Sequence, residues 1–101
     1  MATYGSGYAM PDAALSLSGI SYTTGKYYPQ FGGANCVCKG ARLATGASSG
    51  TGVLMVHPVR GGVDSYPIDL TAGDPPQGFE FDFIVETGTT VDLTKTYVFP
   101  K

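Results

Sequence analysis

The clearest structural signal in this chain is the run Phe79-Glu80-Phe81-Asp82-Phe83-Ile84-Val85. Aromatic residues alternate with carboxylates in this run, and successive residues of a β-strand point to opposite faces of the sheet. The run therefore predicts a half-buried strand, with its three phenylalanines and Val85 in the core and its two carboxylates on the solvent side.

The segment that follows this run carries a second strand pattern. Residues from Val91 to Phe99 are crowded with β-branched and aromatic side chains, which favour strands over helices. Thr87-Gly88-Thr89 lies between the two segments and predicts a hairpin turn. We therefore expect the two segments to pair as antiparallel neighbours.

Glycine and proline divide the rest of the chain into short segments. The 15 glycines and 7 prolines interrupt every stretch before it reaches the roughly 12–15 residues that an isolated helix needs. One short helical turn is expected at 12–16, after Pro11. The other strand candidates are Leu15–Tyr22, Cys36–Ala44, Val53–Val59 and Val63–Leu70. Because proline cannot donate to the ladder, Pro67 restricts the segment Val63–Leu70 to an edge strand or a bulge. The predicted fold is all-β: a single small antiparallel β-sandwich or barrel of about six strands.

Composition excludes several classes of protein. A chain of 101 residues is one domain in size, and its hydrophobic content of 43% is too high for a disordered chain. No apolar run approaches the roughly 20 residues of a membrane span. The N-terminus has neither the basic region nor the apolar core of a secretory signal. A net charge of −2 argues against a strongly basic nucleic-acid binder. We therefore expect neither a membrane nor a nucleic acid as partner.

The first residues differ from the rest. They contain Gly5 and Gly7 and show no strand pattern, so we expect residues 1–12 to be a docking arm and residues 13–101 to be the β domain. Tyrosine is enriched at interfaces because one end of its side chain is apolar and the other polar. The candidate partner-binding residues are Tyr4, Tyr8, Tyr22, Tyr27 and Tyr28.

The cysteines and the histidine do not predict a metal or catalytic centre. Cys36 and Cys38 are one residue apart, and on a strand their side chains are poorly placed for a disulfide. A closed zinc site needs four ligands, whereas the chain has 2 cysteines and 1 histidine. We expect two reduced thiols, and neither a metal nor a cofactor. His57 shares a strand face with Val53 and Met55, and no nucleophile motif accompanies it. We therefore interpret it as a structural or interface residue.

The acidic residues leave one enzymatic alternative. Glu80 and Asp82 are about 7 Å apart on a strand, which loosely fits the carboxylate pair of an inverting glycosidase, and Glu86 lies close by in sequence. A solvated strand face looks the same, so a small hydrolase using Glu80 and Asp82 is the less favoured hypothesis. Acidic residues are concentrated between Asp64 and Asp92, whereas most basic residues precede Gly61. Either the two halves of the chain form oppositely charged faces, which suits packing of identical copies, or the fold mixes the charges of the two halves.

The general pattern resembles a class of viral proteins. Its features are the Gly/Ser/Thr-rich strand pattern, the start Met1-Ala-Thr-Tyr-Gly-Ser-Gly7, the turn Thr24-Gly-Lys-Tyr-Tyr-Pro29 and the lack of a secretion signal. Together they resemble small all-β bacteriophage virion accessory proteins, which decorate or cement a capsid or belong to a tail. The resemblance implies a non-enzymatic protein, made in the host cytoplasm and located in the virion. It implies the major capsid protein or another virion protein as partner, and homo-oligomers, commonly trimers. A carbohydrate- or receptor-binding module of a fibre or spike tip is the alternative.

Overall fold

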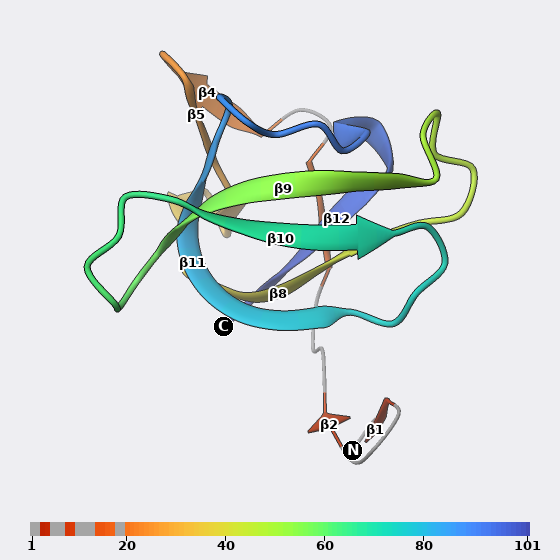
Figure 1. Ribbon diagram of the computed structural model, residues 1–101. Coiled ribbons are helices and arrows are strands. Elements are labelled where there is room, and N and C mark those ends of the chain that lie inside the picture. Colours follow the sequence, from red (N-terminus) through yellow and green to blue (C-terminus); the bar gives the residue numbers. More distant parts are fainter. Residues whose placement is uncertain (1–2, 5–7, 10–13, 18–19) are drawn as a thin grey trace.

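A curled antiparallel sheet forms the body of the molecule and bends into a half-barrel (Figure 1). This computed structural model describes residues 3–4, 8–9, 14–17 and 20–101. Their regular elements are strands and one short 3₁₀ helix, which confirms the predicted all-β class. The elements are β1 (Thr3–Tyr4), β2 (Tyr8–Ala9), β3 (Leu15–Ser16), β4 (Ser21–Thr23), β5 (Lys26–Tyr28), β6 (Gln30–Phe31), β7 (Ala34–Asn35), β8 (Cys38–Leu43), β9 (Thr51–Pro58), β10 (Tyr66–Thr71), β11 (Gln77–Val85), η1 (Leu93–Lys95) and β12 (Thr96–Pro100).

Strand β11 is the hub of the sheet. The order along the sheet is β10-β9-β11-β8-β12-β3, and β5 also pairs with β11 while β4 pairs with β5. The first half of β11 pairs with β8, where Gly78 lies opposite Gly40. The second half pairs with β9 and β5, so that Ile84 lies opposite both Val56 and Tyr27. This change of partners along one strand bends the sheet around its own inner face (Figure 1).

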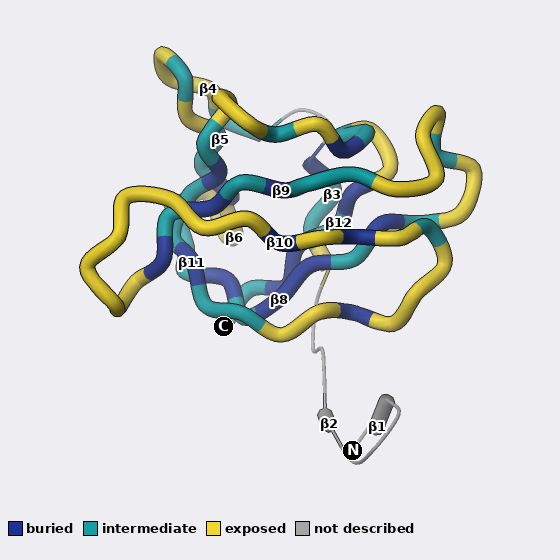
Figure 2. The backbone as a smooth tube through the Cα atoms, in the orientation of Figure 1, coloured by how far each residue is buried: buried dark blue, intermediate teal, exposed yellow. Residues whose placement is uncertain are grey.

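The core fills the inside of this bend, where the buried parts of the strands face one another (Figure 2). On β9 and β10 alternate residues are buried, as the period-2 pattern predicts. The core cluster consists of Leu17, Cys38, Ala41, Leu43, Leu54, Val56, Ile68, Leu70, Phe81, Ile84, Val91 and Val98. In the described part of the chain, no helix has the length and apolarity that crossing a membrane requires.

The phenylalanine run in β11 does not keep the alternation that its sequence predicts. Phe81 and Ile84 are fully buried, whereas Phe79 and Phe83 are half-buried. The expectation that all three phenylalanines lie in the core is therefore wrong. The register shifts on both sides of Phe81, first against β8 and then against β9. Bulges of this kind change which side chains face inward, so Ile84 occupies the core where Phe83 was expected.

The predicted hairpin between residues 79–85 and 91–99 is also wrong. A turn does follow β11, where the N–H of Thr89 donates to the carbonyl of Glu86 at 3.1 Å. Strand β12, however, pairs with β8 and β3. The second half of β11 already has β9 on one side and β5 on the other, so it offers no free edge for a further strand.

The chain after this turn runs beside β9 and hydrogen-bonds to it. The N–H groups of Thr90 and Val91 donate to the carbonyl of Val53 at 2.9 and 3.2 Å. The Thr90 hydroxyl accepts from the N–H of Val53 at 2.9 Å. The Thr89 hydroxyl accepts from the N–H of Met55, two residues further along β9, at 3.0 Å. Gly52 permits this close approach, because a Cβ atom there would lie 2.5 Å from the Cα of Val91.

Asp92 fixes the start of β12. Its carboxylate accepts hydrogen bonds from the N–H of Ser48 at 2.8 Å and from the N–H and hydroxyl of Thr94 at 3.1 and 2.6 Å. These hydrogen bonds, led by the one from Ser48, lower the pKa of Asp92 to about 2. The carboxylate thereby ties the connection between β8 and β9 to the first turn of η1.

Pro67 places β10 at an edge of the sheet, as predicted, with β9 as its neighbour. The N–H of Ala72 donates to the carbonyl of Gly50 at 2.8 Å. Counting back along the antiparallel ladder from this bond puts the nitrogen of Pro67 on the unpaired side. Proline is tolerated there because it has no donor to lose. It also discourages another strand from pairing with this edge.

Shorter elements differ more from the sequence-based expectation. Leu15 and Ser16 form strand β3, so the helical turn expected at 12–16 is wrong for these two residues; positions 12 and 13 lie outside the described residues. The turn expected at 24–29 is instead a hairpin, whose strands β4 and β5 pair with each other. In the expected arm, β1 and β2 pair with each other as a two-stranded sheet. The side chains of Tyr4 and Tyr8 lie outside the described residues.

Candidate functional site

The most exposed of the described candidate tyrosines lies on the β4–β5 hairpin, which we call the tyrosine hairpin (residues 21–28). Tyr22 and Tyr27 are cross-strand neighbours, with ring centroids 5.0 Å apart. Tyr22 is 51% exposed, whereas Tyr27 and Tyr28 are half-buried. The hairpin projects from one corner of the half-barrel (Figure 1).

One carboxylate holds both tyrosines of this pair. The hydroxyl groups of Tyr22 and Tyr27 donate to the two oxygens of Glu86, at 3.0 and 3.3 Å. Desolvation and the Glu86 carboxylate raise the pKa of Tyr27, which keeps its hydroxyl protonated as a donor. The N–H of Gly25 donates to the Tyr22 oxygen at 3.1 Å, and the N–H of Glu86 donates to the Gly25 carbonyl at 2.9 Å. An exposed aromatic ring is thus fixed in place by hydrogen bonds within the protein.

The opposite face of β5 belongs to a packed cluster. Tyr28 contacts Phe83 with ring centroids 5.3 Å apart, and the Lys26 ammonium lies 4.9 Å from the Phe83 centroid. His57 stacks on Phe83 at 4.5 Å with nearly parallel rings. His57 Nδ1 donates to Asp82 Oδ1 at 2.6 Å, and both side chains remain partly exposed, at 34% and 40%.

This His57–Asp82 pair was missed in the sequence. An orienting carboxylate is one of the two groups that a general base requires, and the structure supplies it from the neighbouring strand. The bulge in β11 places Phe83 directly opposite His57, which brings the adjacent Asp82 within reach of the ring. Phe83 stacks on the same imidazole, so the pair is part of the packing between β9 and β11. The pattern of Val53 to Val59 alone gives no sign of it.

The two carboxylates of the hydrolase alternative bind different partners. Glu80 forms an ion pair with Lys101, with 3.0 Å between Oε2 and Nζ, whereas Asp82 is bound to His57. Glu86 accepts from the two tyrosines. Among residues 14–17 and 20–101, no three His, Cys, Asp or Glu side chains gather closely enough to hold a metal ion.

Both cysteines are free thiols. Cys38 is fully buried, and this burial, together with the neighbouring Cys36, raises the pKa of the Cys38 thiol. Cys36 is half-buried, and its thiol donates weakly to the carbonyl of Pro29 at 3.6 Å. Their surroundings are those of packing residues.

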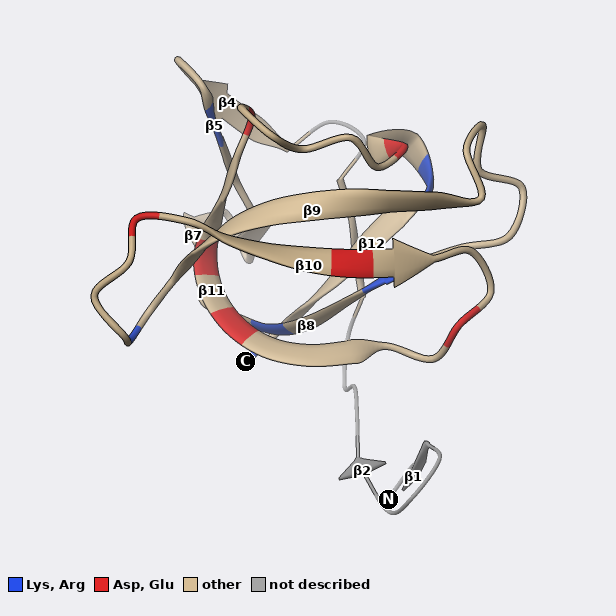
Figure 3. Cartoon of the chain, viewed as in Figure 1, with Lys and Arg blue, Asp and Glu red and all other residues tan. Residues whose placement is uncertain are grey.

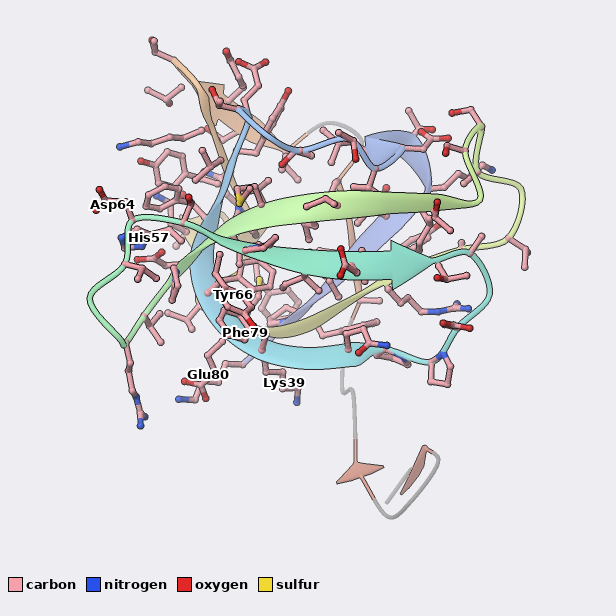
Figure 4. All side chains as sticks on the ribbon, viewed as in Figure 1. Lys39, His57, Asp64, Tyr66, Phe79 and Glu80 are labelled. Atoms are coloured by element: carbon pink, nitrogen blue, oxygen red, sulfur yellow. The ribbon has the colours of Figure 1, made fainter. Side chains whose placement is uncertain are left out.

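A second aromatic surface lies at the open side of the half-barrel. Tyr66 on the edge strand β10 stacks on Phe79 of β11, with centroids 4.8 Å apart and an interplanar angle of 11°. Figure 4 shows this pair with Lys39 and Glu80 near it, drawn from neighbouring strands. Tyr66 lies on the same side of β10 as the buried Ile68 and is 48% exposed. The stack thus joins the edge strand β10 to β11, with which it does not pair.

The charged halves of the sequence are mixed by the fold. Acidic and basic residues are interspersed along the ribbon in Figure 3. Lys26 lies opposite Val85, next to Glu86, and Arg42 donates to the carbonyl of Asp74 at 3.3 Å. This mixing follows from the pairing of β5 and β8 with β11, which brings early and late residues together. Opposite charged faces are therefore not formed.

Comparison with known proteins identifies no relative: no family model matches the sequence, no curated protein matches it, and no solved structure matches the fold. Function is therefore inferred from the side chains themselves.

Proposed function

We propose that this protein is a non-enzymatic structural protein of a bacteriophage particle that binds the capsid surface as a decoration or cement protein. The observation that carries the proposal is the tyrosine hairpin, where Tyr22 is half-exposed yet held by Glu86 and Tyr27. The major capsid protein is the proposed partner, and the virion the proposed location.

A fixed, exposed tyrosine is suited to binding another protein. Ordering a free side chain at an interface costs about 0.5–1.5 kcal/mol, and the two hydrogen bonds at the Tyr22 hydroxyl remove much of that cost in advance. Tyrosine is also among the residues that dominate binding energy in interfaces.

The engagement of the carboxylates favours binding over hydrolysis. A glycosidase pair needs one carboxylic acid and one carboxylate facing the same bond. Here Glu80 and Asp82 are each bound to a different basic side chain. Their contacts connect β11 to β9 and to the end of the chain, and so contribute to the fold.

The test uses particles of the phage that encodes this chain, prepared with its gene deleted. Added protein should bind these particles saturably and raise the temperature at which they release DNA. Tyr22→Ala should weaken binding at least about 30-fold, the equivalent of a hot-spot loss of about 2 kcal/mol. Phe31→Ala is the matched control, because Phe31 is equally exposed, at 54%, on another hairpin.

Two results would overturn the proposal. One is that the particles do not bind the added protein and release their DNA at the same temperature with and without it. The other is binding that Tyr22→Ala and Phe31→Ala weaken equally. Binding of the isolated protein to a glycan array, lost in Tyr22→Ala and without any binding to particles, would replace the proposal with the carbohydrate-binding alternative.

A further inference from the structure

The connection between β9 and β10 concentrates exposed apolar side chains. Five large hydrophobic residues are exposed among the described residues, and Val59, Val63 and Tyr66 account for three of them, at 37%, 50% and 48%. All three lie within residues 59–66, which we call the valine loop. The Tyr66 ring is fixed by stacking on Phe79, so part of this apolar surface is ordered in advance.

The same loop carries one charge of each sign. Arg60 stands near the start of the loop in the sequence and Asp64 nearer its end, and Figure 3 shows one basic and one acidic segment in this loop. The ion pairs of the described residues are His57–Asp82 and Lys101–Glu80, so neither loop charge is paired there. The acidic Glu80, near Tyr66, is already neutralised by Lys101.

These two features make the loop complementary to itself. If two copies of the loop lie antiparallel, Arg60 of each copy meets Asp64 of the other, and Val63, which lies between the two charges, meets its counterpart in the other copy. A two-fold axis repeats every contact, so each charge pair occurs twice. Gly61 and Gly62 have positive φ angles of 101° and 74°, and a Cβ at either would meet nothing within 4 Å. Their lack of side chains lets two loops approach closely.

We propose that the valine loop is a self-association surface through which a second copy of this chain binds to form a closed two-fold dimer. The contact is made by side chains and not by strand addition, because Pro67 removes a donor from the adjoining edge of β10. The inference does not depend on the proposed particle binding, which uses the separate tyrosine hairpin.

The test is sedimentation equilibrium of the purified full chain, from about 10 μM to about 1 mM. The wild type should be a dimer that weakens with added salt. Arg60→Asp alone and Asp64→Arg alone should each raise the dissociation constant about tenfold or more, because each creates two like-charge contacts. The double variant Arg60→Asp/Asp64→Arg should restore the dimer to within about threefold of the wild type.

Matched controls separate this surface from a general loss of charge or apolar area. Asp69→Arg changes an exposed carboxylate on the outer face of β10 and should leave the dimer unchanged. Val63→Ser should abolish the dimer, whereas Phe31→Ser should not. A wild type that is monomeric at about 1 mM, a trimer, or a double variant that fails to recover would each overturn the proposal. Tyr22→Ala should leave the dimer intact, so the outcome here is independent of the outcome with particles.

Discussion

Replacing Gly52 by alanine tests whether the segment 89–91 completes the sheet beside β9. A Cβ at position 52 would lie 2.5 Å from the Val91 Cα and 2.9 Å from its nitrogen, and backbone atoms cannot rotate away. The segment must therefore move by about 1 Å, which strains or breaks its two hydrogen bonds to the Val53 carbonyl. Overpacking costs about 1–3 kcal/mol, and the loss of one of these hydrogen bonds about 0.5–1.5 kcal/mol. We expect Gly52→Ala to lower the free energy of unfolding by about 2–4 kcal/mol.

The measurement is chemical and thermal unfolding, followed by circular dichroism. For a domain of this size, about 2–4 kcal/mol corresponds to a decrease in Tm of roughly 10–25 °C. Gly50→Ala is the control, because Gly50 is exposed and a Cβ there would meet nothing within 4 Å. It should be neutral or stabilise by up to about 1 kcal/mol. If Gly52→Ala unfolds within about 0.5 kcal/mol of the wild type, the close packing of Val91 on β9 is wrong.

Three further predictions concern single side chains. Phe81→Ala should cost about 3–5 kcal/mol because Phe81 is fully buried; a smaller loss than for Phe83→Ala in the same unfolding assay would contradict this. Asp92 has a lowered pKa of about 2, so it contributes stability above its unfolded value of about 4, and this stability is lost as the pH falls through about 2. Asp92→Asn should flatten that part of the acid-unfolding curve, and coincident curves would exclude the effect. In the native protein Cys36 should react with a thiol reagent faster than Cys38, whose raised pKa and burial disfavour the thiolate; equal rates would refute the assignment.

The local sequence pattern predicts the fold correctly where a strand pairs regularly with its neighbour, without a shift in register. The strand expected at Val53 to Val59 is present as β9, which buries alternate residues. Pro67 lacks a donor, and β10 is an edge strand. The all-β class also follows, because glycine and proline leave no room for a long helix.

The sequence-based predictions are wrong where the pairing of distant segments determines the structure. The alternation in the sequence places Phe79 and Phe83 in the core together with Phe81. Two bulges in β11 instead leave Phe81 and Ile84 as the buried residues. A bulge depends on the partner strand, and one strand's sequence does not encode it. Thr87-Gly88 forms a turn, yet its sequence does not specify which strand lies beside the chain that leaves it.

The candidate site shows the same division. Tyr22 and Tyr27 were found from residue type and position, since tyrosine is favoured at interfaces. Their link to Glu86, 64 and 59 residues away, depends on β5 pairing with β11. The His57–Asp82 pair spans 25 residues and depends on the register between β9 and β11. The valine loop could have been identified from its sequence, because two valines and two opposite charges surround a pair of glycines.

The position of β12 between β8 and β3 has a consequence for how the protein folds. Val98 lies opposite Ala41 on one side and Leu15 on the other, so the sheet closes only when segments far apart in the sequence meet. The β9–β10 hairpin needs only local contacts and can form early. Proteins dominated by non-local strand pairs fold in about milliseconds to seconds. We expect the insertion of β12 to be the slow step, and before it occurs β8 presents an unpaired edge to other chains. Refolding should therefore lose more material to aggregation as protein concentration rises, and a short peptide of residues 96–100 should reduce that loss by occupying the edge of β8.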